Sequence, residues 1–116
     1  MPFVDVPSLP ILEPRAGWQG RFFHSEHMTF VYYAIDAGSS VQVHHHDEEE
    51  VWHVVEGELE ISLSGSTQRL KPGQAAIVPA GAPHGVRAVA ASRVIVVDYP
   101  VRTSVGGVDT GAAGAA

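Results

Sequence analysis

The 116-residue chain contains no cysteine. This absence excludes a disulfide framework and any metal site built on thiolates, and it fits a protein of a reducing compartment. No stretch is apolar over the roughly 20 residues that a membrane-spanning helix needs. The first residues also lack the basic region of a signal peptide. We therefore expect a soluble, cytoplasmic protein that makes no membrane contact.

Positive charge is also scarce in this chain. Seven Lys and Arg residues stand against 13 Asp and Glu residues, which gives a formal net charge of −6 at pH 7. Nucleic acids and anionic membranes are bound through clustered basic residues. The charge balance therefore argues against nucleic acid and anionic membrane as partners.

The third absence is that of a sustained 3.6-residue hydrophobic period, the pattern of an amphipathic helix. Short apolar runs rich in Val are instead separated by turns built from 12 Gly and 8 Pro. Residues 28–36 are aromatic and β-branched, residues 58–63 alternate strictly, and one strand is expected to continue from the turn at 37–39 to Val55. The pattern predicts an all-β fold of eight to ten strands, for which jelly rolls and barrels are the closed solutions. We expect Phe30, Tyr32 and Tyr33 in its core.

Composition divides the chain into three segments. Residues 1–17 contain four prolines and are expected to form an extended N-terminal arm that lies against the body. Residues 18–100 hold the strand-like runs and are expected to form one barrel domain. Residues 101–116 form a Gly/Ala-rich C-terminal tail of linker-like composition.

The most informative stretch is residues 38–57, GSSVQVHHHDEEEVWHVVEG. Side chains alternate faces along a strand, so His44, His46 and Glu50 are expected to share one face, with Glu48 between them. Two histidines and a carboxylate are a known way to hold a divalent metal with open coordination positions. The alternative is a solvated charged loop without a ligand role. A solvated loop would not need the apolar run that follows, or the Gly/Pro-rich segment 73–84 that ends in His84, so both features favour the metal site.

These two segments resemble the two sequence motifs of the cupin superfamily. The first motif is G-x5-H-x-H-x3-4-E-x6-G, and the second is G-x5-P-x-G-x2-H-x3-N. One position departs from the second motif, because Ala88 stands where the family has Asn. The matching residues in this chain are Gly38, His44, His46, Glu50 and Gly57 for the first motif, and Gly73, Pro79, Gly81 and His84 for the second.

The resemblance implies a double-stranded β-helix, the conical jelly-roll barrel of cupins, with one divalent transition metal bound inside. The implied ligands are His44, His46, Glu50 and His84. Imidazole and carboxylate suit Fe, Mn, Ni, Cu or Zn, and the ligand types do not select among these metals. Similar cupins include dioxygenases, isomerases, lyases and cyclases. Small cupins resemble one another in pairing through sheet edges, so we also expect a homodimer here, in which the Pro-rich arm is free to cover a partner's edge.

The other chemically capable residues have less defined roles. His45 and His53 fall on the opposite strand face and are expected at the surface or in an interface. His24 and His27 lie outside both motifs and are expected in strand or edge positions, with an acid/base role in the cavity as the alternative. Trp52 can line the pocket or pack in the barrel wall. The sequence does not show which of Arg21, Arg87 and Arg93 points inward.

Two functions follow as hypotheses. The first is a metal-dependent enzyme acting on a small organic molecule, because three histidines and one glutamate leave one or two positions open on a six-coordinate ion. The second is a non-catalytic cupin that binds metal or senses a small ligand. No separate general base stands out in the sequence, so the fold alone does not choose the reaction.

Overall fold

The computed structural model describes residues 3–112, which form twelve strands and one short 3-10 helix. Over this range no helix has the length and hydropathy needed to cross a membrane. The elements are η1 (Val6–Ser8), β1 (Leu12–Arg15), β2 (Trp18–His24), β3 (Thr29–Ile35), β4 (Ser40–His44), β5 (Glu49–Glu56), β6 (Leu59–Leu63), β7 (Ser66–Leu70), β8 (Ala75–Val78), β9 (His84–Ala88), β10 (Ser92–Tyr99), β11 (Ser104–Val105) and β12 (Val108–Asp109).

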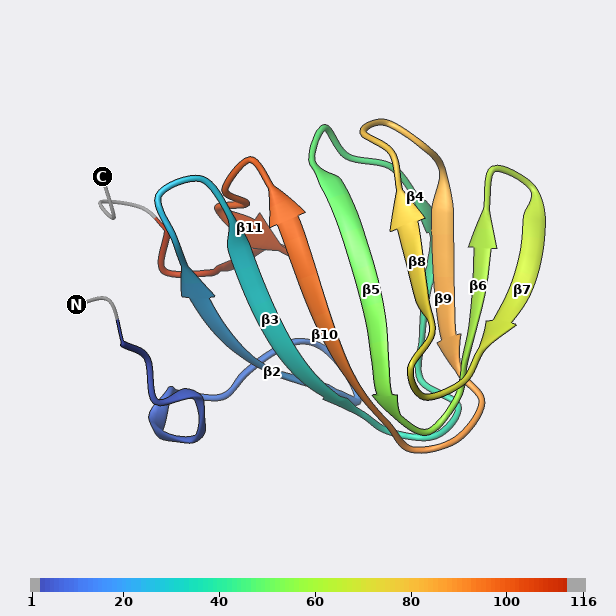
Figure 1. Cartoon of the computed structure of the whole chain (residues 1–116), viewed down its shortest axis with the longest axis horizontal. Coiled ribbons are helices and arrows are strands. Elements are labelled where there is room, and N and C mark those ends of the chain that lie inside the picture. The colour runs from blue at the N-terminus through green and yellow to red at the C-terminus, as the bar shows by residue number, and fades with distance from the viewer. Residues whose placement is uncertain (1–2, 113–116) are drawn as a thin grey trace.

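The strands form two main antiparallel sheets that face each other (Figure 1). The larger sheet has the order β1-β2-β3-β10-β5-β8, and the smaller has the order β4-β9-β6-β7. β11 and β12 form a separate hairpin near the C-terminus. Some neighbours in the sheets are not consecutive in the chain, since β10 lies between β3 and β5 and β9 lies between β4 and β6. The all-β prediction is confirmed.

The strand count exceeds the expected eight to ten for two reasons. The long strand expected to reach Val55 is divided: β4 ends at His44, residues 45–48 form a loop, and β5 begins at Glu49 in the other sheet. The run of charged residues breaks the apolar pattern at this point, and the chain uses the break to cross between the sheets. The remaining additions are β1 and the β11–β12 hairpin, in the two terminal segments that we expected to be an arm and a tail.

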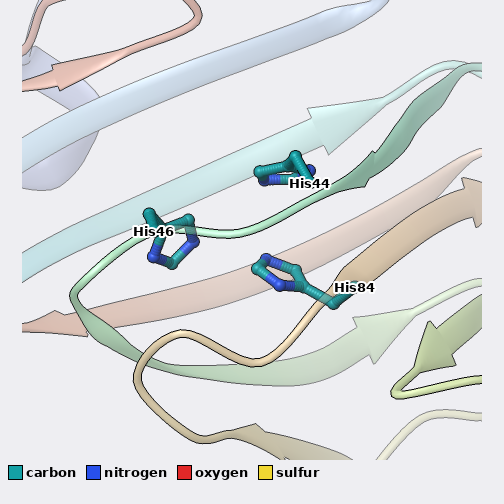
Figure 2. A group of neighbouring side chains, drawn as sticks. All are labelled: His44, His46 and His84. Carbon is teal, nitrogen blue, oxygen red and sulfur yellow. The ribbon is translucent and has the colours of Figure 1, made fainter.

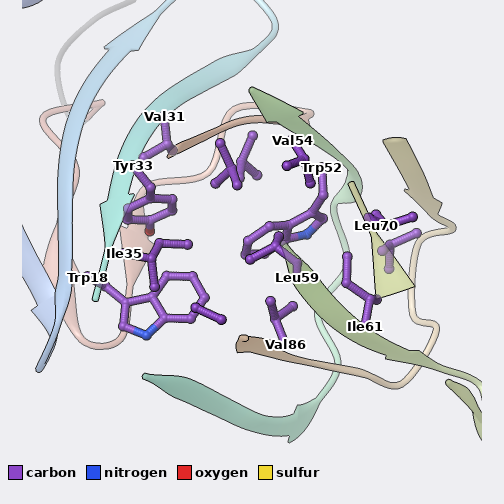
Figure 3. Close-up of a cluster of buried hydrophobic side chains, with 14 of the residues drawn as sticks. Trp18, Val31, Tyr33, Ile35, Trp52, Val54, Leu59, Ile61, Leu70 and Val86 are labelled. Carbon is purple, nitrogen blue, oxygen red and sulfur yellow. The ribbon is translucent and has the colours of Figure 1, made fainter. Parts of the chain in front are cut away.

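The core lies between the sheets and follows the period-two alternation of the strands. In β3 the buried residues are Thr29, Val31, Tyr33 and Ile35, and the residues between them are more exposed. On the inner face of the larger sheet the Trp18 ring packs edge to face against two other rings, with centroids 5.4 Å from Tyr33 and 5.8 Å from Trp52 (Figure 3). Leu59, Ile61 and Val86 of the smaller sheet pack against them.

The alternation also corrects one expectation about the core. Tyr33 is buried at 6% exposure, but Tyr32 is 37% exposed because its neighbour in the strand occupies the inward position. Phe30 shares the outer face and is half-buried against Phe23, with ring centroids 4.8 Å apart. Gly20 gives Tyr33 its space, since a Cβ at Gly20 would lie 2.8 Å from the tyrosine ring.

Both terminal segments pack against the barrel. β1 pairs with β2 at the edge of the larger sheet. At the other end, Val105, Thr110 and Ala112 are buried, which a solvated linker would not require. His24 anchors this segment because its Nε2 lies 2.9 Å from the Thr110 carbonyl oxygen. The last four residues of the expected tail, 113–116, lie outside the described residues.

Candidate metal centre

Three histidines lie close together, two from the end of β4 and the loop after it and one from the start of β9 (Figure 2). His44 ends β4 and His84 begins β9, and the two residues are directly paired across the smaller sheet. A register shift between Val41 and His44 changes the direction of the strand just before the site, as β-bulges commonly do. The two imidazole centroids are consequently 4.4 Å apart.

His46 reaches the same point from the loop that joins the two sheets. Its backbone carbonyl accepts a hydrogen bond of 2.8 Å from Gly81 N, in the Pro/Gly corner that precedes His84. This bond ties the 45–48 loop to the second motif. The His46 ring lies 4.8 Å from the His84 ring and 5.6 Å from the His44 ring, measured between centroids.

The ring nitrogens of these histidines have a common arrangement. Each Nδ1 is within hydrogen-bonding distance of a backbone carbonyl oxygen: 2.8 Å from Gln42 for His44, 3.1 Å from Glu48 for His46, and 2.9 Å from Ala82 for His84. A carbonyl only accepts, so each Nδ1 carries the proton and each neutral ring presents the lone pair of Nε2. The Nε2 atoms of His46 and His84 are buried and have no hydrogen-bond partner among the described residues.

Glu50 approaches this cluster from β5, in the opposite sheet. Its carboxylate oxygens lie 3.3 Å from Nε2 of His84 and 3.6 Å from Nε2 of His46, and the residue is 2% exposed. Glu50 does not share one compact cluster with all three histidines; it groups instead with His46 and Asp98. The His44/His46/Glu50 strand face expected from alternation is therefore wrong in its geometry, because a loop separates the residues, although the fold still gathers all three.

Two residues that the sequence interpretation missed, Arg102 and Asp98, lie beside Glu50. Arg102 Nη1 donates to Glu50 Oε2 at 3.0 Å, and Asp98, the residue paired with Glu50 across β10 and β5, is 1% exposed. Trp52 Nε1 donates to Glu50 Oε1 at 2.6 Å. A signal for Asp98 was present in the sequence, since it continues the inward alternation of Val94 and Val96. Arg102 follows the last long strand, in the segment expected to be a tail, and had no such signal.

The electrostatics of these groups follow from their burial. Burial opposes ionisation of Glu50, but contacts with His46 and His84 and the charge of Arg102 outweigh it and hold the pKa of Glu50 well below its usual range. Burial, together with the adjacent Glu50, raises the pKa of Asp98 to about 10. At neutral pH Glu50 is therefore ionised and Asp98 keeps its proton.

The pKa values of His44 and His84 are shifted in opposite directions. Burial lowers the pKa of His44 below its usual value, and the neighbouring His84 adds to this effect. Burial also disfavours the cationic form of His84, but its contact with Glu50 prevails and raises the pKa of His84.

The other histidines and arginines considered from the sequence lie away from the three-histidine cluster. His45 and His53 are exposed, as expected from their strand parity, and His27 is exposed beside Glu26. His24 uses both ring nitrogens, on Thr29 and Thr110, and holds the C-terminal segment. Arg21, Arg87 and Arg93 do not line the interior cavity, which is instead bordered by Arg15 and Arg102. That cavity, of about 20 Å³, lies among His44, Glu50 and Trp52.

Comparison with known proteins identifies the family of the chain. Residues 31–99, more than half of the chain, match the family model described as Cupin domain. The chain belongs to the cupin family. An uncharacterised Streptomyces coelicolor protein is 32% identical over 81 residues, which cover 69% of this cupin and 77% of the relative.

Solved structures show the same fold. KdgF from Halomonas sp. is 28% identical, with a TM-score of 0.81 over 86% of this chain and 94% of that chain. An RmlC-like cupin from Shewanella frigidimarina is 24% identical, with a TM-score of 0.82 over 88% and 93% of the two chains. The expected jelly-roll barrel is thereby confirmed.

Proposed function

We propose that this cupin is a metal-dependent enzyme that acts on a small organic molecule. One divalent transition ion per chain would be held by Nε2 of His44, His46 and His84 together with the Glu50 carboxylate. The supporting observation is the set of three Nδ1 contacts to backbone carbonyls, which leaves the Nε2 lone pair of each ring available, in three rings that offer ligand atoms within 4.8 Å of one another. Metal-binding histidines commonly have their second nitrogen fixed in this way.

The donor set also fits such an ion chemically. Two buried Nε2 atoms without a partner are costly unless something else binds them. Three neutral imidazoles and one carboxylate suit Fe, Mn, Ni, Cu or Zn, and affinity order alone does not choose the native metal. When bound, the ion would supply Lewis-acid or O₂-dependent chemistry, within the dioxygenase, isomerase, lyase and cyclase types considered for cupins.

The protein's own groups prepare the site for this role. Arg102 and Trp52 fix the two oxygens of Glu50, so the carboxylate is ionised and held toward His46 and His84. Asp98 keeps its proton beside Glu50, so only one of these two paired carboxyl groups is charged. The aromatic rings of Trp18, Tyr33 and Trp52 line the interior cavity beside Glu50.

Metal analysis of purified variants tests the proposal. Wild-type protein loaded with Mn²⁺, Fe²⁺, Ni²⁺, Cu²⁺ or Zn²⁺ and then desalted should retain about one ion per chain. His44→Ala should lose most of it, and the double change His44→Ala with His46→Ala should retain none. His45→Ala is the matched control and should retain the wild-type amount, because this side chain is exposed. Equal metal loss in the His44→Ala and His45→Ala proteins, or full retention in His84→Ala, would contradict the assignment.

A non-catalytic binding or sensing cupin is the second candidate. The observation that favours it is the size of the interior cavity, about 20 Å³, which is close to the space of a single water molecule. Assays of O₂ uptake and product formation with diketones, phenols and uronates separate the two functions. Turnover by metal-loaded protein supports the enzyme, and ligand binding without turnover supports the second candidate.

We also propose that the chain forms a homodimer through the outer face of the larger sheet. Tyr32 and Val55 are exposed on this face and border a groove of about 310 Å³ that also includes Ile95. Exposed apolar sheet faces of this kind are commonly covered by a partner.

A further inference from the structure

Asp98 is a buried carboxyl group whose oxygens have no hydrogen-bond partner. It lies near the end of β10 and is 1% exposed, and neither Oδ1 nor Oδ2 makes a hydrogen bond to another of the described residues. Its Oδ2 is 3.8 Å from Arg102 Nη1, but the closer partner of that nitrogen is Glu50, at 3.0 Å. Burying a polar group in this way is costly unless something else binds its oxygens.

The Asp98 carboxyl group lies among two of the candidate metal ligands. Asp98, His46 and Glu50 each offer a ligand atom, and these three atoms lie within 4.8 Å of one another. Asp98 is directly paired with Glu50 across β10 and β5, so both carboxyl groups project to the same side of the sheet. His46 keeps Nδ1 on the Glu48 carbonyl oxygen, and its Nε2 is buried without a partner. His46 and Glu50 therefore belong both to the three-histidine site and to a group that includes Asp98.

The space beside Asp98 limits what its oxygens can bind. The interior cavity that Asp98 lines together with His44 and Glu50 is about 20 Å³, close to the space of one water molecule. That space excludes an organic ligand next to Asp98 and leaves a water molecule or a metal ion. One imidazole and two carboxylates are ligand types that divalent transition ions take. A bound water is the simpler occupant, but it gives Asp98 no preference for one metal over another.

The charges around this group also accommodate a second carboxylate ligand. Arg102 lies 3.0 Å from Glu50 and 3.9 Å from Glu48, so its single charge is shared between two acids. A divalent ion beside these three groups would bring their formal net charge to +1, and the half-buried Arg15 on the cavity wall adds to the positive side. An ionised Asp98 would offset this excess. The proton that it keeps in the metal-free protein would then leave as the ion binds, as protons leave other ligands.

We infer that Asp98 is a further ligand of the candidate metal centre, beside His46 and Glu50, and that its oxygen favours Mn²⁺ over Zn²⁺ there. Zn²⁺ is commonly satisfied by four ligands, which the three histidines and Glu50 already supply. Mn²⁺ takes a larger coordination number and prefers carboxylate oxygen, so an additional oxygen ligand matters more to it. This inference rests on the proposed function, since it requires an ion at the three histidines.

Metal-competition titrations of three proteins test the inference. The dissociation constants for Mn²⁺ and Zn²⁺ are measured at neutral pH for wild type, Asp98→Asn and Asp47→Asn. Asp98→Asn should bind Mn²⁺ at least roughly tenfold more weakly and Zn²⁺ within about threefold of wild type. Asp47→Asn is the matched control, because it removes an exposed carboxylate next to His46. It should bind both metals within about twofold of wild type.

The contrast between the two metals separates ligation from other effects of Asp98. A residue that acts only through its charge, or only by orienting Glu50, would weaken both divalent ions to a similar degree. Equal weakening of Mn²⁺ and Zn²⁺ in Asp98→Asn, or unchanged Mn²⁺ affinity, therefore overturns the inference and leaves the proposed function standing. A wild type that binds neither metal contradicts the proposed function itself, and the inference with it.

A second measurement does not depend on a variant folding. Wild type is labelled with aspartate that carries ¹³C in its side-chain carboxyl group, loaded with Mn²⁺ and studied by pulsed electron paramagnetic resonance. A ¹³C hyperfine coupling of the size that a ligating carboxylate gives is expected, and unlabelled protein is the blank. Its absence in Mn²⁺-loaded protein would refute the inference. The signal identifies Asp98 because the other aspartates of the chain are all exposed: Asp5, Asp36, Asp47 and Asp109.

Discussion

Replacing Arg102 by Met should destabilise the metal-free protein by about 3 kcal/mol. Arg102 Nη1 lies 3.0 Å from Glu50 Oε2, and the two side chains are 13% and 2% exposed. Met keeps the length and apolar stem of the side chain but removes its charge and its donors. Glu50 is then left ionised and buried beside Asp98, with only Trp52 and the histidines to support it.

The magnitude follows from distance and burial. Two unit charges 3.0 Å apart attract by about 5.5 kcal/mol at an effective dielectric constant of about 20. Part of this attraction offsets the cost of removing both charges from water, so the net effect is smaller. Breaking a buried pair by removing one partner typically costs about 3–5 kcal/mol. We take the lower end because Arg102 retains some exposure.

Arg69→Met is the matched control. Arg69 Nη1 lies 3.2 Å from Glu58 Oε2, nearly the same distance, but the arginine side chain is 56% exposed. In water the attraction at this distance is about 1 kcal/mol, and exposed pairs contribute about 0–1 kcal/mol. The two variants therefore separate the effect of burial from the effect of losing an arginine.

Urea denaturation of metal-free protein, followed by tryptophan fluorescence, measures both variants. A loss of 3 kcal/mol corresponds to a midpoint lowered by roughly 2 M at an m-value of about 1.5 kcal/mol/M. The Arg69→Met midpoint should fall by less than about 0.7 M. Similar small shifts in both variants would refute the reasoning, because they would mean that the Glu50–Arg102 pair gains nothing from its burial.

Three further predictions concern metal release, a close-packed turn and assembly. Metal affinity should fall as pH decreases, starting above the ordinary histidine pKa of about 6.5, because the raised pKa of His84 lets this ligand take a proton there. A metal affinity that stays unchanged from pH 8 to 5, measured by metal-competition titration, would contradict this. Gly57→Ala should cost several kcal/mol, since at φ +85° its Cβ would lie 2.5 Å from the Ala91 carbonyl oxygen, whereas Gly65→Ala, at the same φ in open space, should cost about 1 kcal/mol in the same urea assay. Sedimentation equilibrium at micromolar concentration should give twice the chain mass of 12.3 kDa, and a monomeric mass would rule out the dimer.

Period-two alternation carried most of the fold prediction. It identified β6, and the aromatic and β-branched composition of residues 28–36 identified β3. The inward face of β3 was not identified, since Phe30 and Tyr32 were expected in the core and lie on the outer face. The alternation also failed where the chain leaves the sheet. Residues 45–48 carry a charged sequence that is compatible with either an exposed strand or a loop, and only the pairing of β4 with β9 and of β5 with β10 shows that the chain crosses between sheets there.

The histidines of the site were found through their spacing, but their surroundings were not. Asp98 and Arg102 meet Glu50 because β10 pairs with β5 and the chain then turns back over the barrel end. Arg15 reaches the cavity because β1 adds to the edge of β2. Contacts between residues so far apart in the chain depend on the order of the strands, and the spacing of residues within one motif contains no information on that order.

Arg15 and Arg102, the two missed arginines, come from opposite ends of the described chain, and the structure brings these ends together. Gly106, next to the β11 strand, packs so closely against β1 that an added Cβ would lie 2.7 Å from the Pro14 carbonyl oxygen. His24 fixes Thr110 from the other side. The motif-bearing middle of the chain therefore provides the candidate metal ligands, while the two ends provide the charges around them. Because these ends lie outside both motifs, changes there can alter the charge around the site without altering the candidate metal ligands.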